Sequence, residues 1–351
     1  MSRSLIEDLQ RLVDIPSATG EEDRLCSYLQ ERLLSRWGSE AVQRFGNSLV
    51  VGSSSGRGLV VLYGHLDTVP QQAEPGSRID GDRLYGLGAS DMKAGIAVMV
   101  HLLEDSAVRQ GRYDVVGVFY DREEGPAQEN GLENVLDAVD WLASAEFAVV
   151  LEPTDLELQL GCQGFINATV TFTGRSAHSA RPWLGENAVT KAGEWLAAMH
   201  LRRPEPVAVA GLEYLELFTV TRAAGGVARN IVPPRFDVNL NYRFPPTLTV
   251  EEAEARLRET TVAADKVTIV DGAAGAPVPE GNPHLERLQA VSGSPRAPKQ
   301  AWTDVARLAQ RGVAAVNYGP GEVAQAHQAD ESVPVANLEA AFDTLKAFLT
   351  S

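Results

Sequence analysis

The chain has 351 residues, of which 44% are hydrophobic and 22% are charged, and its formal net charge at pH 7 is −16. This length predicts two domains, and the composition is typical of a globular protein. The acidic balance argues against nucleic acid or an anionic membrane as a partner, because either would require a basic surface.

The N-terminal segment turns acidic at Glu7 and Asp8, before the apolar core of a signal peptide could form. No hydrophobic run approaches the length of a transmembrane helix. The two cysteines, Cys26 and Cys162, are too few for a disulfide scaffold. These features predict a cytoplasmic protein.

The first half of the chain predicts alternating helices and strands. Leucines at helical spacing predict two N-terminal helices, and the apolar run 94–103 predicts a helix buried against a sheet. Hydrophobic runs predict strands at 47–51, 59–63, 115–120 and 147–151. This order indicates an α/β domain with a mostly parallel sheet.

The pattern changes at Gly164, where a second domain is predicted. Strands are expected at 165–172, 215–220, 236–244 and 267–270, with helices at 187–200 and after a capping box at 249–252. The order β-α-β-β-α-β is ferredoxin-like. A further strand at 313–318 returns to the first domain, so we predict a catalytic domain over 1–163 and 273–351 with 164–272 inserted.

Seven acidic or histidine residues follow the strands of the first domain or, in one case, precede its buried helix. They are His65, Asp67, Asp91, Glu123, Glu124, Glu152 and His327. Ligand sites of open α/β sheets lie at the carboxyl ends of the strands, so these side chains should converge on one edge. A set of His, Asp and Glu without cysteine suits zinc, cobalt or manganese.

A centre of two ions, roughly 3.5–4 Å apart, needs a carboxylate that bridges them, and Asp91 is the candidate. His65 with Glu152, and Glu124 with His327, then supply one histidine and one glutamate to each ion. Asp67 stands just beyond the strand end, where it can accept the imidazole N–H of His65 and fix its tautomer.

Glu123 is predicted to be a general base, because two adjacent glutamates cannot easily bind one ion with similar geometry. Such a base typically contributes about 10²–10⁴ in rate. The predicted reaction is hydrolysis of an amide by metal-activated water. An isolated His-x-Asp or Glu-Glu pair is usually a surface feature, so the prediction depends on the agreement of five separate segments.

In this order the motifs resemble the M20 family of metallo-aminoacylases and exopeptidases. The matching segments are 64–70, 86–95, 123–125, 152–154, 174–179 and 326–327. The resemblance implies a metal-dependent amidohydrolase with two zinc ions, or cobalt in their place, on the ligands proposed above. It also implies a cis peptide after Asp91.

Four further segments resemble the succinyl-diaminopimelate desuccinylases of high-GC Gram-positive bacteria: 161–164, 177–188, 302–307 and 317–321. This implies hydrolysis of a small anionic acyl amino acid, N-succinyl-LL-2,6-diaminopimelate, to succinate and LL-2,6-diaminopimelate in lysine and cell-wall precursor biosynthesis. It also implies a homodimer made by the inserted domain, with His178 reaching the active site of the partner subunit.

A substrate with several carboxylates needs cationic anchors, and the guanidinium groups of Arg175 and Arg243 suit this role. The resemblance adds His178, Asn230, Thr303 and Gly319 as substrate-binding residues. The loop 322–325 and Pro234 depart from the family pattern and leave the substrate preference open.

Two alternatives remain for the function. Another M20 deacylase, such as an acetylornithine deacetylase or an aminoacylase, would share every metal ligand. A non-catalytic amino-acid-binding protein on the same fold would be expected to lack a ligand or Glu123, and this chain has them all.

Overall fold

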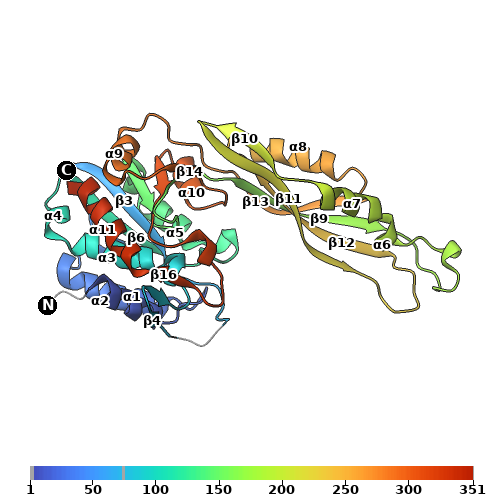
Figure 1. Ribbon diagram of the computed structural model, residues 1–351, viewed down its shortest axis with the longest axis horizontal. Helices are drawn as coiled ribbons and strands as arrows, with labels where there is room; N and C mark the ends of the chain where they lie inside the picture. Colours follow the sequence, from blue (N-terminus) through green and yellow to red (C-terminus); the bar gives the residue numbers. More distant parts are fainter. Residues whose placement is uncertain (1–3, 73–75, 351) are drawn as a thin grey trace. The chain divides into compact units, whose positions relative to one another are not determined.

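The computed structural model describes residues 4–72 and 76–350, which form two compact units (Figure 1). The first unit contains the chain up to Leu160, Pro279–Ala297 and the chain from Arg307; the second contains Gly161–Val278 and Pro298–Ala306. The predicted boundaries at 164 and 272 lie close to these. Pro298–Ala306, predicted as part of the first domain, groups with the second unit.

An eight-stranded sheet forms the centre of the first unit, in the order β1-β2-β6-β3-β7-β15-β8-β14. The four central strands, from β6 to β15, are parallel, while β1, β2 and β8 pair antiparallel. The prediction of a mostly parallel sheet is therefore confirmed. The strands are β1 (Val42–Phe45), β2 (Ser48–Val51), β3 (Gly58–His65), β6 (Tyr113–Tyr120), β7 (Phe147–Val150), β8 (Leu158–Leu160), β14 (Arg296–Pro298) and β15 (Ala315–Asn317).

Helix α3 (Ala94–Glu104) is the buried helix that the apolar run predicts. It packs on β3 and β6 and contacts α1 and α11. A side chain at Gly95 would lie 2.4 Å from the carbonyl oxygen of Leu151, so only glycine allows this close approach. The other helices containing residues of this unit are α1 (Leu5–Val13), α2 (Asp23–Trp37), α4 (Ser106–Arg109), α5 (Gly131–Ala138), α9 (Pro283–Ser292), α10 (Val305–Gln310) and α11 (Val335–Thr350).

A small three-stranded sheet was not predicted. It joins β4 (Arg78–Asp80), β5 (Arg83–Tyr85) and β16 (Ser332–Pro334), with β5 in the centre. Strands of three residues are too short to show an alternating pattern in the sequence. This sheet brings the segment before Asp91 against the segment after His327.

The second unit is an antiparallel sheet of order β10-β11-β12-β9-β13, with apolar residues of one face buried against helices. Along the chain, and leaving out β10, the strands and helices follow the predicted β-α-β-β-α-β order. The strands are β9 (Gly164–Thr173), β10 (Glu205–Val209), β11 (Leu212–Gly225), β12 (Arg235–Phe244) and β13 (Lys266–Ala273), and the helices are α6 (Ala188–Lys191), α7 (Gly193–Leu201) and α8 (Val250–Thr260).

Three details of the second unit differ from the sequence prediction. The edge strand β10 forms a hairpin with β11 through Ala210 and Gly211, both at positive φ, which suits a two-residue hairpin turn. The single helix predicted at 187–200 is interrupted at Ala192. Strand β11 is longer than predicted and has an irregular register between Val220 and Arg222.

In the part of the chain that the structure describes, no helix combines the length and apolar character needed to cross a membrane.

Candidate metal centre

Neighbouring parallel strands bring the predicted ligands to one edge of the first unit's sheet. His65 is the last residue of β3, Glu123 and Glu124 follow β6, and Glu152 follows β7. Because β6, β3 and β7 are adjacent and parallel, their carboxyl ends meet. The predicted convergence is therefore present in the fold.

One group of candidate ligands consists of His65, Asp91 and Glu152, whose ligand atoms all lie within 4.8 Å of one another. His65 Nε2 is 3.1 Å from Asp91 Oδ1 and 3.8 Å from Glu152 Oε1. The His65 side chain is 1% exposed, so this group lies in the interior. We call it the inner triad.

A second group consists of Asp91, Glu124 and His327, again with ligand atoms within 4.8 Å. His327 Nε2 is 3.0 Å from Glu124 Oε1 and 3.7 Å from Asp91 Oδ2. The His327 side chain is 53% exposed, and we call this group the outer triad. Asp91 belongs to both triads and presents one oxygen to each histidine, which is the arrangement a bridging carboxylate needs.

The donor set fits a pair of divalent cations. Two imidazole nitrogens and three carboxylates, with no thiolate, match zinc, cobalt or manganese. Burial opposes a charge on His65, but hydrogen bonds with Asp67 and Asp91 raise its pKa well above the usual value. Glu124 similarly raises the pKa of His327 to about 9. The same negative field attracts metal cations.

Asp67 is buried, and its contacts differ in one respect from the prediction. His65 Nδ1 is 3.0 Å from the backbone oxygen of Asp67 and 3.6 Å from its carboxylate Oδ1. The nearer acceptor is therefore the carbonyl, which places a proton on Nδ1 and leaves the Nε2 lone pair for a metal.

The carboxylate of Asp67 instead holds the two glutamates that follow β6. Its Oδ1 accepts the backbone N–H of Glu123 at 2.9 Å, and its Oδ2 accepts that of Glu124 at 3.0 Å. The hydroxyl of Thr19 donates to Oδ2 at 2.9 Å. Glu123 also forms a cluster with His65 and Glu124, so the predicted base lies beside ligands of both triads.

The segment around Asp91 is a distorted helical turn, η1 (Ala89–Lys93), in which Asp91 and Met92 have non-helical backbone angles. The Asp91–Met92 peptide is cis, as the resemblance implied. The buried carboxylate of Glu331 accepts hydrogen bonds from this segment, a role that was not predicted from the sequence. Burial raises the pKa of Glu331 to about 7, although the same N–H groups lower it.

Of the predicted substrate-binding residues, Gly319 lies in the first unit and the other five lie in the second. His178 and Asn230 are neighbours there, because Ser179 N–H donates to the Asn230 carbonyl at 2.9 Å. Arg175 is exposed and lies three residues before His178. Arg243 is paired with Phe165 in the β12–β9 register, near the other end of β9. The structure therefore does not bring Arg175 and Arg243 of one chain together.

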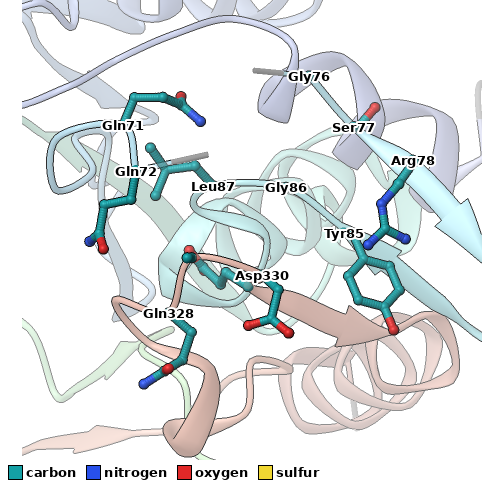
Figure 2. Close-up of a pocket in the computed structure, with 12 residues that line it drawn as sticks. Gln71, Gln72, Gly76, Ser77, Arg78, Tyr85, Gly86, Leu87, Gln328 and Asp330 are labelled. Atoms are coloured by element: carbon teal, nitrogen blue, oxygen red, sulfur yellow. The ribbon is translucent and has the colours of Figure 1, made fainter. Parts of the chain in front are cut away.

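A pocket of about 480 Å³ adjoins the segments that carry the metal ligands (Figure 2). Its walls include Gln71 and Gln72, which come after Asp67, and Gln328 and Asp330, which come after His327. The guanidinium carbon of Arg78 lies 3.9 Å from the ring centroid of Tyr85 on another wall. The ligand-bearing loops thus continue into a pocket with several polar side chains.

A parallel sheet that presents two His–carboxylate triads with a shared aspartate is characteristic of a metal-dependent hydrolase. Comparison with known sequences identifies which one. The model of Peptidase family M20/M25/M40 matches residues 61–351, and the chain belongs to this family.

The similarity to known relatives extends over nearly the whole chain. A Mycobacterium tuberculosis protein, provisionally named succinyl-diaminopimelate desuccinylase DapE, is 39% identical over 98% of this chain and 97% of its own length. A succinyl-diaminopimelate desuccinylase of Corynebacterium glutamicum is 35% identical over 97% and 95%. An acetylornithine deacetylase of Myxococcus xanthus is 28% identical over 90% and 88%. The chain is a metal-dependent amidohydrolase of this family.

Solved structures confirm the fold. A tripeptidase of Staphylococcus aureus aligns with a TM-score of 0.78 at 20% identity, covering 98% of this chain and 96% of that one. A dinuclear metal-binding peptidase of the M20 family from Bacillus subtilis aligns with a TM-score of 0.67 at 14% identity, covering 98% and 96%.

Proposed function

We propose that this protein hydrolyses N-succinyl-LL-2,6-diaminopimelate to succinate and LL-2,6-diaminopimelate. The observation that carries the proposal is the near full-length similarity to two proteins named for this reaction, at 39% and 35% identity. The surroundings of Arg243, which we propose binds a substrate carboxylate, also support it.

The inner and outer triads would hold two divalent ions, for which zinc is our proposal. Bound there, the ions would lower the pKa of a water molecule and polarise the amide carbonyl. Glu123 would take the proton of the attacking water and deliver it to the leaving amine nitrogen. Its backbone is held by the carboxylate of Asp67 at 2.9 Å, which orients this base toward the triads.

Arg243 is suited to bind the distal carboxylate of the succinyl group. Its guanidinium carbon lies 5.3 Å from the ring centroid of Phe165, and its Nε donates to Asn241 Oδ1 at 3.1 Å. Burial lowers its pKa, and within the described residues no carboxylate forms an ion pair with it. An arginine in this state gains most from a substrate carboxylate, and it would disfavour an acetyl group that leaves it unpaired.

The separation between Arg243 and His178 within the second unit supports a homodimer. Arg243 is opposite Phe165, whereas Arg235 is opposite Thr173, beyond which lie Arg175 and His178. Eight residues of strand span about 26 Å at about 3.3 Å per residue. That exceeds the length over which one small substrate can be held, so we assign His178, Arg175 and Asn230 to the active site of the partner subunit.

Mixed dimers test the assignment of His178. His178→Ala and Glu123→Gln homodimers should each be inactive, and subunit exchange between them should restore part of the activity. The restored site combines an intact Glu123 with an intact His178 from the other chain. If confirmed exchange leaves the mixture as inactive as its parents, His178 acts within its own chain.

A substrate panel tests the reaction itself. Zinc-loaded protein should cleave N-succinyl-LL-diaminopimelate faster than N-acetylornithine or N-acetyl amino acids. A preference for N-acetylornithine would reassign the protein to the deacetylases, which are also among its relatives.

A further inference from the structure

The turn that carries the shared ligand Asp91 is held by one buried carboxylate, that of Glu331. Its Oε1 accepts the backbone N–H groups of Ser90 and Asp91 at 2.7 and 2.8 Å, and its Oε2 accepts that of Gly88 at 2.8 Å. Glu331 is 2% exposed. Three backbone N–H groups of this distorted turn thus have their acceptors on a side chain about 240 residues away in sequence.

Glu331 also belongs to the segment that carries the other histidine ligand. It lies four residues after His327, and its carbonyl accepts the N–H of Gly86 at 2.9 Å. The next residue, Ser332, pairs with Tyr85 in the small sheet. The segment of His327 and the segment of Asp91 are therefore joined through Glu331 at both its backbone and its side chain.

A carboxylate fits this role better than the carboxamide of glutamine, which has the same size. It offers acceptors on both oxygens, whereas the amide of glutamine would point N–H donors at one of the backbone N–H groups. Leaving a buried N–H without an acceptor is costly, so the turn would shift to find another. Asp91 is in that turn, and any shift would change how its two oxygens face the two triads.

We propose that Glu331 is a positioning residue that holds Asp91 in place between the inner and outer triads, and so sets the geometry of the metal pair. It is not itself a ligand: its oxygens are engaged by backbone N–H groups. The inference rests on the proposed metal ligands and is independent of the proposed substrate.

Metal binding to Glu331→Gln tests this directly. Outer-shell partners of metal ligands typically contribute about 10–100-fold to metal affinity or activity. Calorimetric titration of zinc into the metal-free variant should therefore show at least one of the two ions bound about tenfold or more weakly than in the wild type. The visible absorption of the cobalt-substituted variant should also change, because the coordination geometry changes.

Two variants serve as references. Asp330→Asn removes the same charge from the neighbouring exposed side chain, which lines the pocket and has no bond to the turn, and it should keep wild-type affinities and cobalt absorption. Asp91→Asn alters the shared ligand itself and should weaken both sites. If Asp91→Asn binds two ions as the wild type does, the ligand assignment is wrong and the proposal for Glu331 is wrong with it.

The proposal is overturned if Glu331→Gln binds both ions with wild-type affinity and unchanged cobalt absorption. The proposal is overturned even if the metal-free variant unfolds at a lower urea concentration, because a loss of stability alone would show only a structural role for Glu331. If Glu331→Gln does not fold, Glu331→Asp decides: it keeps the charge but is shorter, and it should bind zinc with reduced affinity. Wild-type affinity in Glu331→Asp would refute the proposal.

Discussion

Asp67→Asn should slow catalysis while both metal ions stay bound. The carboxylate accepts the N–H of Glu123 on one oxygen and that of Glu124 on the other. Burial alone would raise the pKa of Asp67, but His65 and these N–H groups lower it, so the group is ionised. Asparagine has one acceptor oxygen, and its NH₂ group would face one of the two N–H donors.

The magnitude follows from that single mismatch. A buried donor that loses its partner costs roughly 1–3 kcal/mol. Each 1.36 kcal/mol is a factor of ten in rate, so if the displaced group is Glu123 the loss in kcat is about 5- to 150-fold. The backbone carbonyl of Asp67 still accepts from His65 Nδ1 at 3.0 Å, so the inner triad keeps its tautomer and its affinity for metal.

Steady-state kinetics with metal analysis on the same preparations would check this prediction. Thr19→Val is the matched control: it removes one hydrogen bond to Asp67 but leaves both N–H contacts, and kcat should stay within about threefold. A fully metallated Asp67→Asn enzyme with wild-type kcat would refute the reasoning. Loss of one metal equivalent would show instead that the carboxylate supports a metal ligand, either His65 or Glu124.

Three further outcomes are expected. Chelation should abolish activity and two equivalents of zinc or cobalt should restore it; metal analysis that finds only one bound equivalent at full activity would contradict a metal pair. Arg243→Lys should lower kcat/KM for the succinyl substrate by about tenfold or more, because lysine lacks the planar fork, and should affect an acetyl substrate much less. Burial opposes the charge of Asp8, but hydrogen bonds from His101 and Arg32 lower its pKa from 3.8 to about 2. Because the pKa is lower in the folded state, the ionised carboxylate adds about 2 kcal/mol to the free energy of unfolding above pH 3.8. This contribution is lost as the pH falls toward 2. Urea unfolding of metal-free Asp8→Asn should therefore show a deficit at pH 7 that narrows below pH 3.8; a constant deficit would be inconsistent with this origin.

The convergence of His65, Glu124 and Glu152 could be predicted because each lies at or just beyond the end of a strand whose pattern the sequence shows. A run such as 59–63 identifies a buried strand. The carboxyl ends of adjacent parallel strands always lie at the same edge of the sheet. His65, the last residue of this strand, is thereby placed without knowledge of its distant neighbours.

Glu331 and the carboxylate contacts of Asp67 could not be predicted in this way. Their partners are backbone N–H groups in irregular turns. Every residue except proline has such a group, so the sequence does not show which of them will bind a side chain. Glu331 also precedes a strand of three residues, β16, which is too short to show a pattern.

The difference in exposure between the two histidines has a kinetic consequence. His65 is 1% exposed and His327 is 53% exposed, so the two ions would exchange with solvent at unequal rates. A brief treatment with chelator should empty the outer triad first and leave a protein with a single ion at the inner triad. Adding a different metal to that intermediate would give a heterobimetallic enzyme, in which each ion can be followed by its own spectroscopic signal.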